Sequence, residues 1–389
     1  MSANSGRAED VRRANLSAVL NLVYRHGPSS RAALSRATGR DRSTMASLVG
    51  DLVEFGLVEE REPGPLGVAG RPSPVVGIRS DVVAIAIHPE IDALTIAVVG
   101  LDGHVRRVIR QSYDRIPTAG EVISVSAAVL DGMRVELSGL RTVGIGVAVP
   151  GQVRTGDGMV RNAPHLGWHD EPLGEPLADA TGFPVRVAND AALGAIAEHQ
   201  FGAGRGSDHL IYLNGGASGI GGGVISAGIP LGGASGYAGE LGHIRVSSSS
   251  AIDSARIAGT LEAEVTRAEL LESLGLSRAE PGQFEDTLLA NRSARVGSVV
   301  ERQLEHLASA LAAAINVFNP QVIVLGGFLA VLQAYDPEHL RRAVAASTLP
   351  PALESVRITA AELGADLLMV GAAGLAFEPL LLDPALVTR

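Results

Sequence analysis

The sequence predicts an α/β protein in which a small helical unit with a β-hairpin, residues 1–80, precedes a larger body of alternating strands and helices. Three observations support this prediction. Helix-period apolar patterns and a Gly/Pro-rich segment occupy the first 80 residues, buried strands alternate with helices after them, and basic residues are concentrated near the N-terminus. With 389 residues, 46% of them hydrophobic, the chain is long enough for two or three domains with a sizeable core.

Charge is unevenly distributed along the chain. The formal net charge is -10, yet residues 1–80 contain 11 Arg against 8 acidic residues, and the chain has no Lys. A basic unit on an acidic body is typical of a nucleic-acid-binding domain attached to a second module. The absence of Cys excludes disulfides and thiolate metal sites. The apolar runs are shorter than a membrane span and the N-terminus lacks a signal-peptide core, so we expect a cytoplasmic protein without membrane contact.

Three short helices are predicted before the hairpin. The apolar residues of the first recur at the spacing of one helix face: Leu16, Val19, Leu20 and Val23. Gly27 and Pro28 end this helix. Ser30 can cap a second helix, which buries Leu34 and ends at Gly39.

The third predicted helix follows Asp41, which can cap it. Its apolar stripe consists of five residues: Met45, Leu48, Val49, Leu52 and Val53. Small and polar residues face outward near its N-terminus, where they would let the helix approach base edges in a DNA major groove. The predicted DNA-contacting residues of the whole unit are Arg31, Arg42, Ser43, Thr44, Ser47 and Arg71.

A β-hairpin with a Gly/Pro-rich tip is predicted after the third helix. Arg71 lies at the tip between Gly70 and Pro72, a placement suited to a narrow minor groove. Three helices and a hairpin could also form a general interaction module. Basic charge, outward small residues and the hairpin together favour a winged helix-turn-helix domain that binds double-stranded DNA.

The body is predicted to consist of two similar halves, each of which starts with a hairpin. In the first half, a hairpin with an Asp102-Gly103 turn precedes a helix, the buried strand TVGIGVAVPG, and a helix–strand–helix segment that contains PVRVAND. In the second half, HLIYLNGGASGIGGGVISAG reads as strand, turn and strand, and precedes a long Ala/Leu-rich helix and the strand QVIVLGG. This organisation predicts two lobes with a cleft between them.

From about residue 11 to about residue 380 the chain resembles transcriptional regulators of the ROK family (repressor, open reading frame, kinase), a group that contains xylose and N-acetylglucosamine repressors. The matching segments occur in family order: SSRAALSRATG with RSTMASLV, the hairpin GRP, GIGVAVPG, NAPHLGW, VANDAALGAIAE, GIGGGVI, GYAGELGH, VIVLGG and GAAGLA. The resemblance implies a winged helix-turn-helix domain at residues 1–80. It implies a two-lobed sugar-kinase/actin-like (ribonuclease H-like) body, with one lobe at 81–195, rejoined by about 370–389, and the other at 196–369. It also implies a homodimer or higher homo-oligomer.

Kinases of this family carry Asp-x-Gly-Gly-Thr in the first hairpin of the body, where it holds ATP phosphates and metal. The corresponding loop here is His88-Pro89-Glu90-Ile91-Asp92. It has no Gly, Pro89 lacks a donor N–H, and Glu90 and Asp92 would repel phosphate. We therefore expect no enzyme activity and no cofactor, with a ROK-type sugar kinase as a remote alternative.

The resemblance implies a sugar site formed by Asn189, Asp190, Glu240, His243 and Glu262. Asn189 and Asp190 follow a buried strand and open the next helix, a common position for ligand groups in α/β sheets. In the kinases the residue at the position of Asp190 is the catalytic base, and without an ATP loop it can still accept a hydrogen bond from a sugar hydroxyl. The alternatives are that Asp190 is only a helix cap and that His243 is a buried residue paired with backbone.

Relatives follow this His with Cys-x-Cys-Gly-x-x-Gly-Cys-x-Glu, and the His and three Cys bind structural zinc. Here the Cys positions are Asp253, Ala255 and Thr260, while Gly259 and Glu262 are retained. One His and one Asp do not complete a zinc site. We expect no metal and a loop held by packing and hydrogen bonds; a looser metal site at the His and the Asp is the alternative.

The sequence thus predicts a sequence-specific DNA-binding transcriptional regulator, a repressor of sugar-utilisation genes, with a sugar or sugar derivative bound between the lobes. A ligand that prefers one relative pose of the DNA-binding units would control DNA binding. The alternative is a DNA-binding regulator whose sugar pocket is vestigial and which has no sugar effector.

Overall fold

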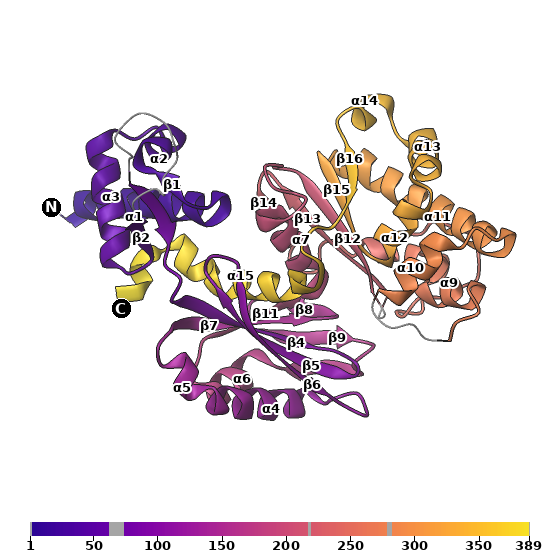
Figure 1. The fold of residues 1–389 in the computed structure, drawn as a ribbon, viewed down its shortest axis with the longest axis horizontal. Helices are drawn as coiled ribbons and strands as arrows, with labels where there is room; N and C mark the ends of the chain where they lie inside the picture. The colour runs from indigo at the N-terminus through magenta and orange to yellow at the C-terminus, as the bar shows by residue number, and fades with distance from the viewer. Residues whose placement is uncertain (1, 62–73, 217–218, 278–281, 389) are drawn as a thin grey trace.

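The structure is a computed structural model that describes residues 2–61, 74–216, 219–277 and 282–388. Figure 1 shows a helical N-terminal unit, a first lobe beside it, and a second lobe on the far side of the molecule. The last long helix returns from the second lobe across the first and ends beside the N-terminal unit. This is the predicted arrangement of a small helical unit followed by a two-lobed α/β body.

The N-terminal unit contains three helices and a three-stranded antiparallel sheet. Its elements are α1 (Ser2–His26), α2 (Arg31–Thr38), α3 (Arg42–Glu54), β1 (Ser29–Ser30), β2 (Val58–Arg61) and β3 (Val75–Ile78). Ser30 Oγ accepts a hydrogen bond from Ala33 N at 3.2 Å and caps α2. Asp41 Oδ1 accepts from Ser43 N and Thr44 N, each at 2.9 Å, and caps α3. Both predicted caps are confirmed; each pairs N–H groups that the first helical turn leaves free.

The prediction is wrong for one residue of the apolar stripe of α3. Met45, Leu48, Val49 and Leu52 are buried, but Val53 is 42% exposed. A helix turns by about 100° per residue, so Val53 lies farther round the helix from the centre of the stripe than the four buried residues do, and it faces solvent. The hairpin tip, residues 62–73, including the predicted DNA contact Arg71, lies outside the described residues.

The first lobe is built on a five-stranded mixed sheet. In spatial order its strands are β11 (Val185–Asn189), β7 (Arg141–Val149), β4 (Val82–Pro89), β5 (Ala93–Gly100) and β6 (Val105–Ser112). Strands β4, β5 and β6 form an antiparallel meander, and β7 and β11 run parallel to β4. A small antiparallel sheet follows β7: β8 (Gln152–Arg154), β9 (Met159–Ala163) and β10 (Trp168–Pro172).

Helices cover both faces of the first sheet (Figure 1). On one face lie α4 (Ala119–Gly132), α5 (Arg134–Leu137) and α6 (Gly174–Thr181). The larger side chains of β4 pack on this face: Val83, Ile85 and Ile87. The smaller Ala84 and Ala86 belong to the core on the opposite face, which is covered by α15 (Leu367–Leu382). Small residues let α15 approach closely, and a Cβ on Gly146 of β7 would lie 1.7 Å from Ala372 O.

By length and composition, α15 and the turn before it (Gly364–Leu382) form the one described segment apolar enough to cross a membrane. In this fold 56% of its most apolar window is buried. The helix packs against β4, β5 and β7 and against α1. Such burial is usual for a core helix, and the segment is weak evidence for membrane contact.

The second lobe repeats the plan of the first. In spatial order its strands are β14 (Ile229–Pro230), β13 (Gly219–Ser226), β12 (Leu210–Gly216), β15 (Val322–Gly327) and β16 (Arg357–Ala360). Strands β12, β13 and β14 form an antiparallel meander, and β15 and β16 run parallel to the strand beside them. The two predicted halves, each beginning with a hairpin, are confirmed.

Seven of the fifteen α-helices that the described residues form belong to the second lobe. They are α8 (Leu261–Glu264), α9 (Arg267–Ser273), α10 (Gln283–Ala290), α11 (Ala294–Phe318), α12 (Phe328–Tyr335), α13 (Pro337–Ser347) and α14 (Pro350–Leu353). Short 3-10 turns are η1 (Leu241–His243), η2 (Gly364–Asp366) and η3 (Pro384–Thr388). The long α11 is the predicted Ala/Leu-rich helix, whereas the shorter helices around it are not predicted from the sequence.

Helix α7 (Asp190–Phe201) lies between the two sheets. It packs against β12 and β13 of the second lobe and against α15 of the first. Its Glu198 is fully buried. Glu198 Oε2 accepts from Ala203 N at 2.7 Å, and Oε1 accepts from Glu362 N and Leu363 N at 3.0 Å each. These bonds tie the end of α7 to the segment through which the chain returns to the first lobe.

The N-terminal unit and the first lobe share one hydrophobic core. The buried cluster includes Leu16, Val19, Leu20, Val23 and Tyr24 of α1 together with Met369, Ala373, Phe377, Leu380 and Leu381 of α15. Ser17 Oγ and Asn21 Nδ2 donate to the carbonyl of Leu381 at 2.7 and 3.0 Å. Burial of apolar surface is the main favourable term in packing, so the unit is held on the first lobe rather than joined to it by a free linker.

Candidate functional site

The predicted DNA contact Arg31 is engaged within the N-terminal unit. Its Nε and Nη2 donate to the two carboxylate oxygens of Glu60, each at 2.6 Å. This two-point pairing joins the start of α2 to strand β2 of the hairpin. Arg31 therefore has a structural partner already, and its contact with DNA stays a prediction.

Ser43, Thr44 and Ser47 are also engaged. The hydroxyls of Ser43 and Thr44 donate to Asp41 at 2.6 and 2.7 Å, in addition to the backbone caps. These hydrogen bonds hold the pKa of Asp41 below its usual range. Ser47 Oγ accepts from Arg12 Nη2 of α1 at 3.2 Å. The hydroxyls of these three predicted DNA contacts therefore stabilise the start of α3 and its contact with α1.

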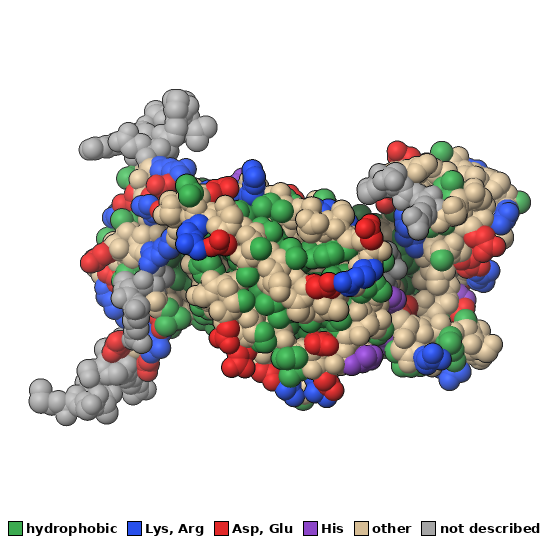
Figure 2. Space-filling model, turned by 90° about the horizontal axis from the view of Figure 1, so that it is seen from below, with side chains coloured by type: hydrophobic (Ala, Val, Ile, Leu, Met, Phe, Trp, Pro, Cys, Tyr) green, Lys and Arg blue, Asp and Glu red, His purple; other side chains and the backbone are tan. Residues whose placement is uncertain are grey.

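Three exposed arginines surround the turn between α2 and α3: Arg36, Arg40 and Arg42. None of them has a hydrogen-bond or ion-pair partner within the described part of the chain. Figure 2 shows basic side chains interspersed with acidic ones at the end of the molecule that carries the N-terminal unit. Arg42 is a predicted contact, whereas Arg36 and Arg40 are missed by sequence reasoning, although both flank the turn at Gly39. Unpaired guanidinium groups at such a turn are suited to DNA phosphates.

A pocket of about 220 Å³ lies between the lobes. All five predicted sugar-binding residues line it: Asn189, Asp190, Glu240, His243 and Glu262. They come from α7 and its cap, from η1 and the residue before it, and from α8. The structure thus brings together residues that are up to 73 positions apart in the sequence. Their role in binding a sugar remains a prediction.

The start of α7 fixes two of these residues. Asn189 is the cap of the helix: its Oδ1 accepts from Ala192 N at 2.9 Å, and its Nδ2 donates to Gly151 O of the first lobe at 3.0 Å. Asp190 is the first helical residue, and its Oδ1 accepts from Ala191 N at 2.7 Å. The alternative of Asp190 as the helix cap is therefore wrong, because Asn189 occupies that position.

Two carboxyl groups of the pocket have raised pKa values. Burial raises the pKa of Asp190, and the charge of His88 acts in the opposite direction. Burial also raises the pKa of Glu240, which is opposed by His243 and by a hydrogen bond from Gln152. Burying a charged group is unfavourable unless polar partners compensate. Hydroxyl donors from a ligand would provide such compensation.

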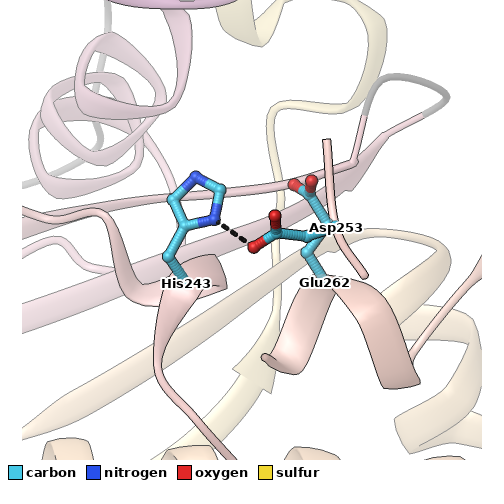
Figure 3. A group of neighbouring side chains, drawn as sticks. All are labelled: His243, Asp253 and Glu262. Atoms are coloured by element: carbon cyan, nitrogen blue, oxygen red, sulfur yellow. Dashed lines mark hydrogen bonds and ion pairs between the residues drawn. The ribbon is translucent and has the colours of Figure 1, made fainter. Parts of the chain in front are cut away.

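His243 is paired with a carboxylate, not with backbone. Its Nδ1 lies 2.8 Å from Asp253 Oδ2 (Figure 3). Thr260 Oγ1 donates to the same oxygen at 2.9 Å, and Ile257 N donates to Oδ1 at 2.8 Å. Burial acts to raise the pKa of Asp253, but these hydrogen bonds together hold it below its usual range. An ionised carboxylate only accepts hydrogen bonds, so in its neutral form the His243 ring carries its proton on Nδ1.

The Glu262 carboxylate connects two segments of the pocket wall. Its Oε2 accepts from Ile220 N of β13 at 2.9 Å, and its Oε1 accepts from Ser254 N at 3.0 Å. Glu262 also accepts from the Ser254 hydroxyl. These bonds fix the carboxylate against the sheet while leaving lone pairs for a ligand.

Sequence reasoning missed five polar residues of the pocket: Gln152, Asn162, His165, Asn214 and Ser254. Two of them lie in NAPHLGW, a segment that carries the family resemblance without an assigned role. Asn162 Oδ1 and His165 Nε2 are buried and have no hydrogen-bond partner among the described residues. Buried polar atoms are nearly always paired in native proteins. Both residues line the pocket, so these two unpaired atoms lie beside it.

The β4–β5 turn contains the loop that the family resemblance aligns with the kinase phosphate loop. His88 Nδ1 lies 2.8 Å from Ala148 O. The carboxylates of Glu90 and Asp92 lie 3.5 and 3.4 Å from Arg110 Nη2. The turn thus presents two carboxylates that share one cation.

Residues 91–378 match the model of the ROK family. A putative xylose repressor from Caldicellulosiruptor sp. is 25% identical, across 96% of this chain and 98% of that protein. A glucokinase from Thermotoga maritima is 31% identical, across 60% of this chain and 79% of that protein. A solved ROK family transcriptional regulator, a homolog of the E. coli MLC protein, has a TM-score of 0.80 and 24% identity, and covers 98% of this chain and 100% of its own. This likeness confirms the predicted fold class.

Proposed function

This chain belongs to the ROK family, and on that premise we propose that it is a cytoplasmic, sequence-specific DNA-binding repressor whose DNA affinity is controlled by a sugar bound between the lobes. Similarity to a xylose repressor over nearly the whole chain supports the regulatory role. The observation that carries the proposal is the position of α7. Its first residues line the pocket, and its last residue, Phe201, contacts Tyr24 in the N-terminal unit.

We place DNA against the face formed by α2 and α3. Arg36, Arg40 and Arg42 supply contacts to phosphates, which position the protein without reading sequence. Arg71 remains our proposed contact in the minor groove. A homodimer would place two copies of α3 in successive major grooves of a near-palindromic site.

The pocket favours a small, uncharged monosaccharide. Its volume of about 220 Å³ equals that of about seven water molecules at about 30 Å³ each, and lies below the usual range for drug-sized ligands. The charged side chains that line it are three carboxylates, Asp190, Glu240 and Glu262; no arginine is among the described lining residues. Sugar hydroxyls can donate to these carboxylates, whereas a sugar phosphate would be repelled by them.

The coupling between sugar and DNA follows from the two lobes sharing α7. A ligand that contacts both walls of the pocket prefers one relative position of the lobes, and it shifts the population toward that position. The N-terminal unit shares a core with the first lobe and also touches α7. Its position relative to the second lobe therefore changes when the angle between the two lobes changes. In a dimer such a change alters the spacing of the two α3 helices.

Similarity to glucokinases makes a sugar kinase the second candidate. The turn at His88–Asp92 argues against it, since it offers two carboxylates and a proline where phosphate binding requires free N–H groups. A coupled assay for ADP release with ATP, magnesium and a panel of monosaccharides tests this candidate directly. Turnover that depends on the sugar would favour the kinase.

The decisive experiment is enrichment of genomic DNA fragments by the purified full chain, followed by affinity measurements with neutral monosaccharides and their 6-phosphates. We expect a few discrete sites with repeated half-sites, whose affinity changes by about 5–150-fold with one neutral monosaccharide. The variant Asp190→Ala should bind the same sites without responding to the sugar. Discrete sites that no sugar affects would support a regulator with a vestigial pocket. Failure to enrich any fragment would refute the DNA-binding role.

A further inference from the structure

By the family resemblance, the loop from His243 to Glu262 corresponds to the segment in which zinc-bearing members hold their metal, and its donor set does not fit zinc. Structural zinc requires four protein ligands in tetrahedral geometry. Ala255 offers no ligand atom. The Thr260 hydroxyl donates to Asp253 and accepts from Ala263 N at 3.3 Å, so both of its roles are taken.

We propose that Asp253 replaces the metal as the centre that holds this loop, and that it acts as the positioning residue for His243 in the sugar pocket. The Asp253 side chain is completely shielded from solvent. It accepts hydrogen bonds from three separate segments: from His243 at the end of η1, from Ile257 N in the following turn, and from Thr260 at the start of α8. A metal would join the same segments through coordination bonds.

The first consequence concerns the ring of His243. Because the carboxylate of Asp253 accepts from Nδ1, the neutral ring leaves Nε2 without a proton. Nε2 lies 3.9 Å from Glu240 Oε2, and both residues line the pocket. Nε2 and the Glu240 carboxylate are then two neighbouring acceptors, a pair suited to two hydroxyl donors on adjacent carbons of a sugar. This step rests on the proposed sugar-binding function.

The second consequence concerns Glu262. Thr260 caps α8, and Glu262 is the second residue of that helix. Fixing Thr260 on Asp253 therefore fixes the position from which Glu262 reaches Ile220 N and Ser254 N. Asp253 thus places two of the five predicted sugar-binding residues without touching the ligand itself.

The test uses the full chain and three variants. In Asp253→Asn the amide N–H₂ can donate to His243 Nδ1, which moves the ring proton to Nε2 and removes the acceptor from the pocket. We expect sugar affinity to fall by about 10–100-fold, the range seen when a metal-binding His loses its outer hydrogen-bond partner. Thr260→Val keeps the hydrogen bond between His243 and Asp253, so its sugar affinity should fall less. Asp131→Asn, a change at an exposed ion pair on α4, is the matched control and should bind sugar normally.

A spectroscopic measurement separates positioning from general damage to the loop. Histidine-selective nitrogen-15 NMR, with His243 assigned through His243→Gln, should show the proton on Nδ1 in the wild-type chain and in Thr260→Val, and on Nε2 in Asp253→Asn. A wild-type His243 with its proton on Nε2 would overturn the proposal. This result needs no sugar, so it stands even if no monosaccharide binds and the effector part of the proposed function fails.

Metal analysis tests the alternative that this loop binds a divalent metal. His243, Asp253 and Glu262 each offer one ligand atom, and these atoms lie within 4.8 Å of one another. We expect no stoichiometric divalent metal in protein purified from zinc-supplemented medium, and sugar affinity that is unchanged by a chelator. Stoichiometric zinc that is lost in Asp253→Asn would make Asp253 a metal ligand and would refute its role as a replacement.

Discussion

The ring of Phe201, the last residue of α7, packs edge-on against the ring of Tyr24 in α1, with centroids 5.1 Å apart and planes inclined at 82°. Phe377 of α15 also approaches Tyr24, at 6.5 Å between centroids. Helix α7 has 12 residues and so spans about 18 Å from the pocket to this contact. Helix α7 begins at the pocket, and through this aromatic contact its other end touches the N-terminal unit.

We expect Phe201→Leu to weaken the coupling between sugar and DNA while leaving each binding reaction nearly intact. The smaller side chain loses the edge-on contact with Tyr24 but preserves apolar packing, so the fold should tolerate it. The sugar-induced change in DNA affinity should shrink by about 0.5–2 kcal/mol. Fluorescence anisotropy with labelled operator DNA, with and without sugar, measures this difference. The matched control is Phe183→Leu in the first lobe, which should retain the full response; an unchanged response in Phe201→Leu would argue against this route.

Arg40→Ala should weaken DNA binding equally for all sequences. Arg40 is exposed and has no partner among the described residues, so its charge is available for a phosphate. Loss of one phosphate contact lowers the slope of log affinity against log salt by about one. Arg31→Ala should lower this slope less, because Arg31 already pairs with Glu60. An equal loss of slope in both variants would show that the Arg31–Glu60 pair opens on DNA. Arg134→Ala, in the first lobe, is the control.

Asp190→Asn should raise the stability of the fold at neutral pH. Burial raises the pKa of Asp190, with His88 acting in the opposite direction. A carboxyl group whose pKa is higher in the folded state stabilises the fold where it is protonated, and this contribution is lost as the pH rises through the raised pKa. The neutral amide removes that loss, so Tm should rise by about 1 °C for each kcal/mol gained in a chain of 389 residues.

The gain from Asp190→Asn should disappear below about pH 4, where the carboxyl is protonated in both states. Differential scanning calorimetry at neutral and acidic pH provides the comparison. Asp131→Asn at an exposed site should show no such pH dependence. A Tm that falls at neutral pH would mean that ionised Asp190 is well compensated by its surroundings.

Gly146→Ala and Gly297→Ala should have opposite effects on stability. A Cβ on Gly146 would lie 1.7 Å from Ala372 O, so α15 must move and the free energy of unfolding should fall by about 3 kcal/mol or more. A Cβ on Gly297, inside α11, meets nothing within 4 Å, and Ala there should stabilise the helix by about 0.5–1 kcal/mol. Urea denaturation of both variants tests the pair. Similar losses in both would contradict the close packing of α15 on β7.

Much of the architecture was predictable because its signals are local, whereas the pocket residues were expected from the family resemblance. The caps Ser30 and Asp41 act within three residues of themselves, and the alternation along β4 shows which side chains share a face. The position of Asn189 and Asp190 after a buried strand marks the ligand-binding end of the first sheet. The boundary predicted between residues 195 and 196, by contrast, falls inside α7.

The pocket residues were expected from the family resemblance. The sequence by itself determined the main order of strands and helices, the helix boundaries set by caps and the repeated hairpin plan. These follow from periodicity and capping, which involve residues within one or two turns of each other. Only the tertiary structure decided that Arg31 pairs with Glu60, that Ser47 pairs with Arg12, and that Asp253 joins His243 to Thr260. Such contacts depend on the relative placement of separate elements. That placement is set by burial in the shared cores rather than by any neighbouring residue.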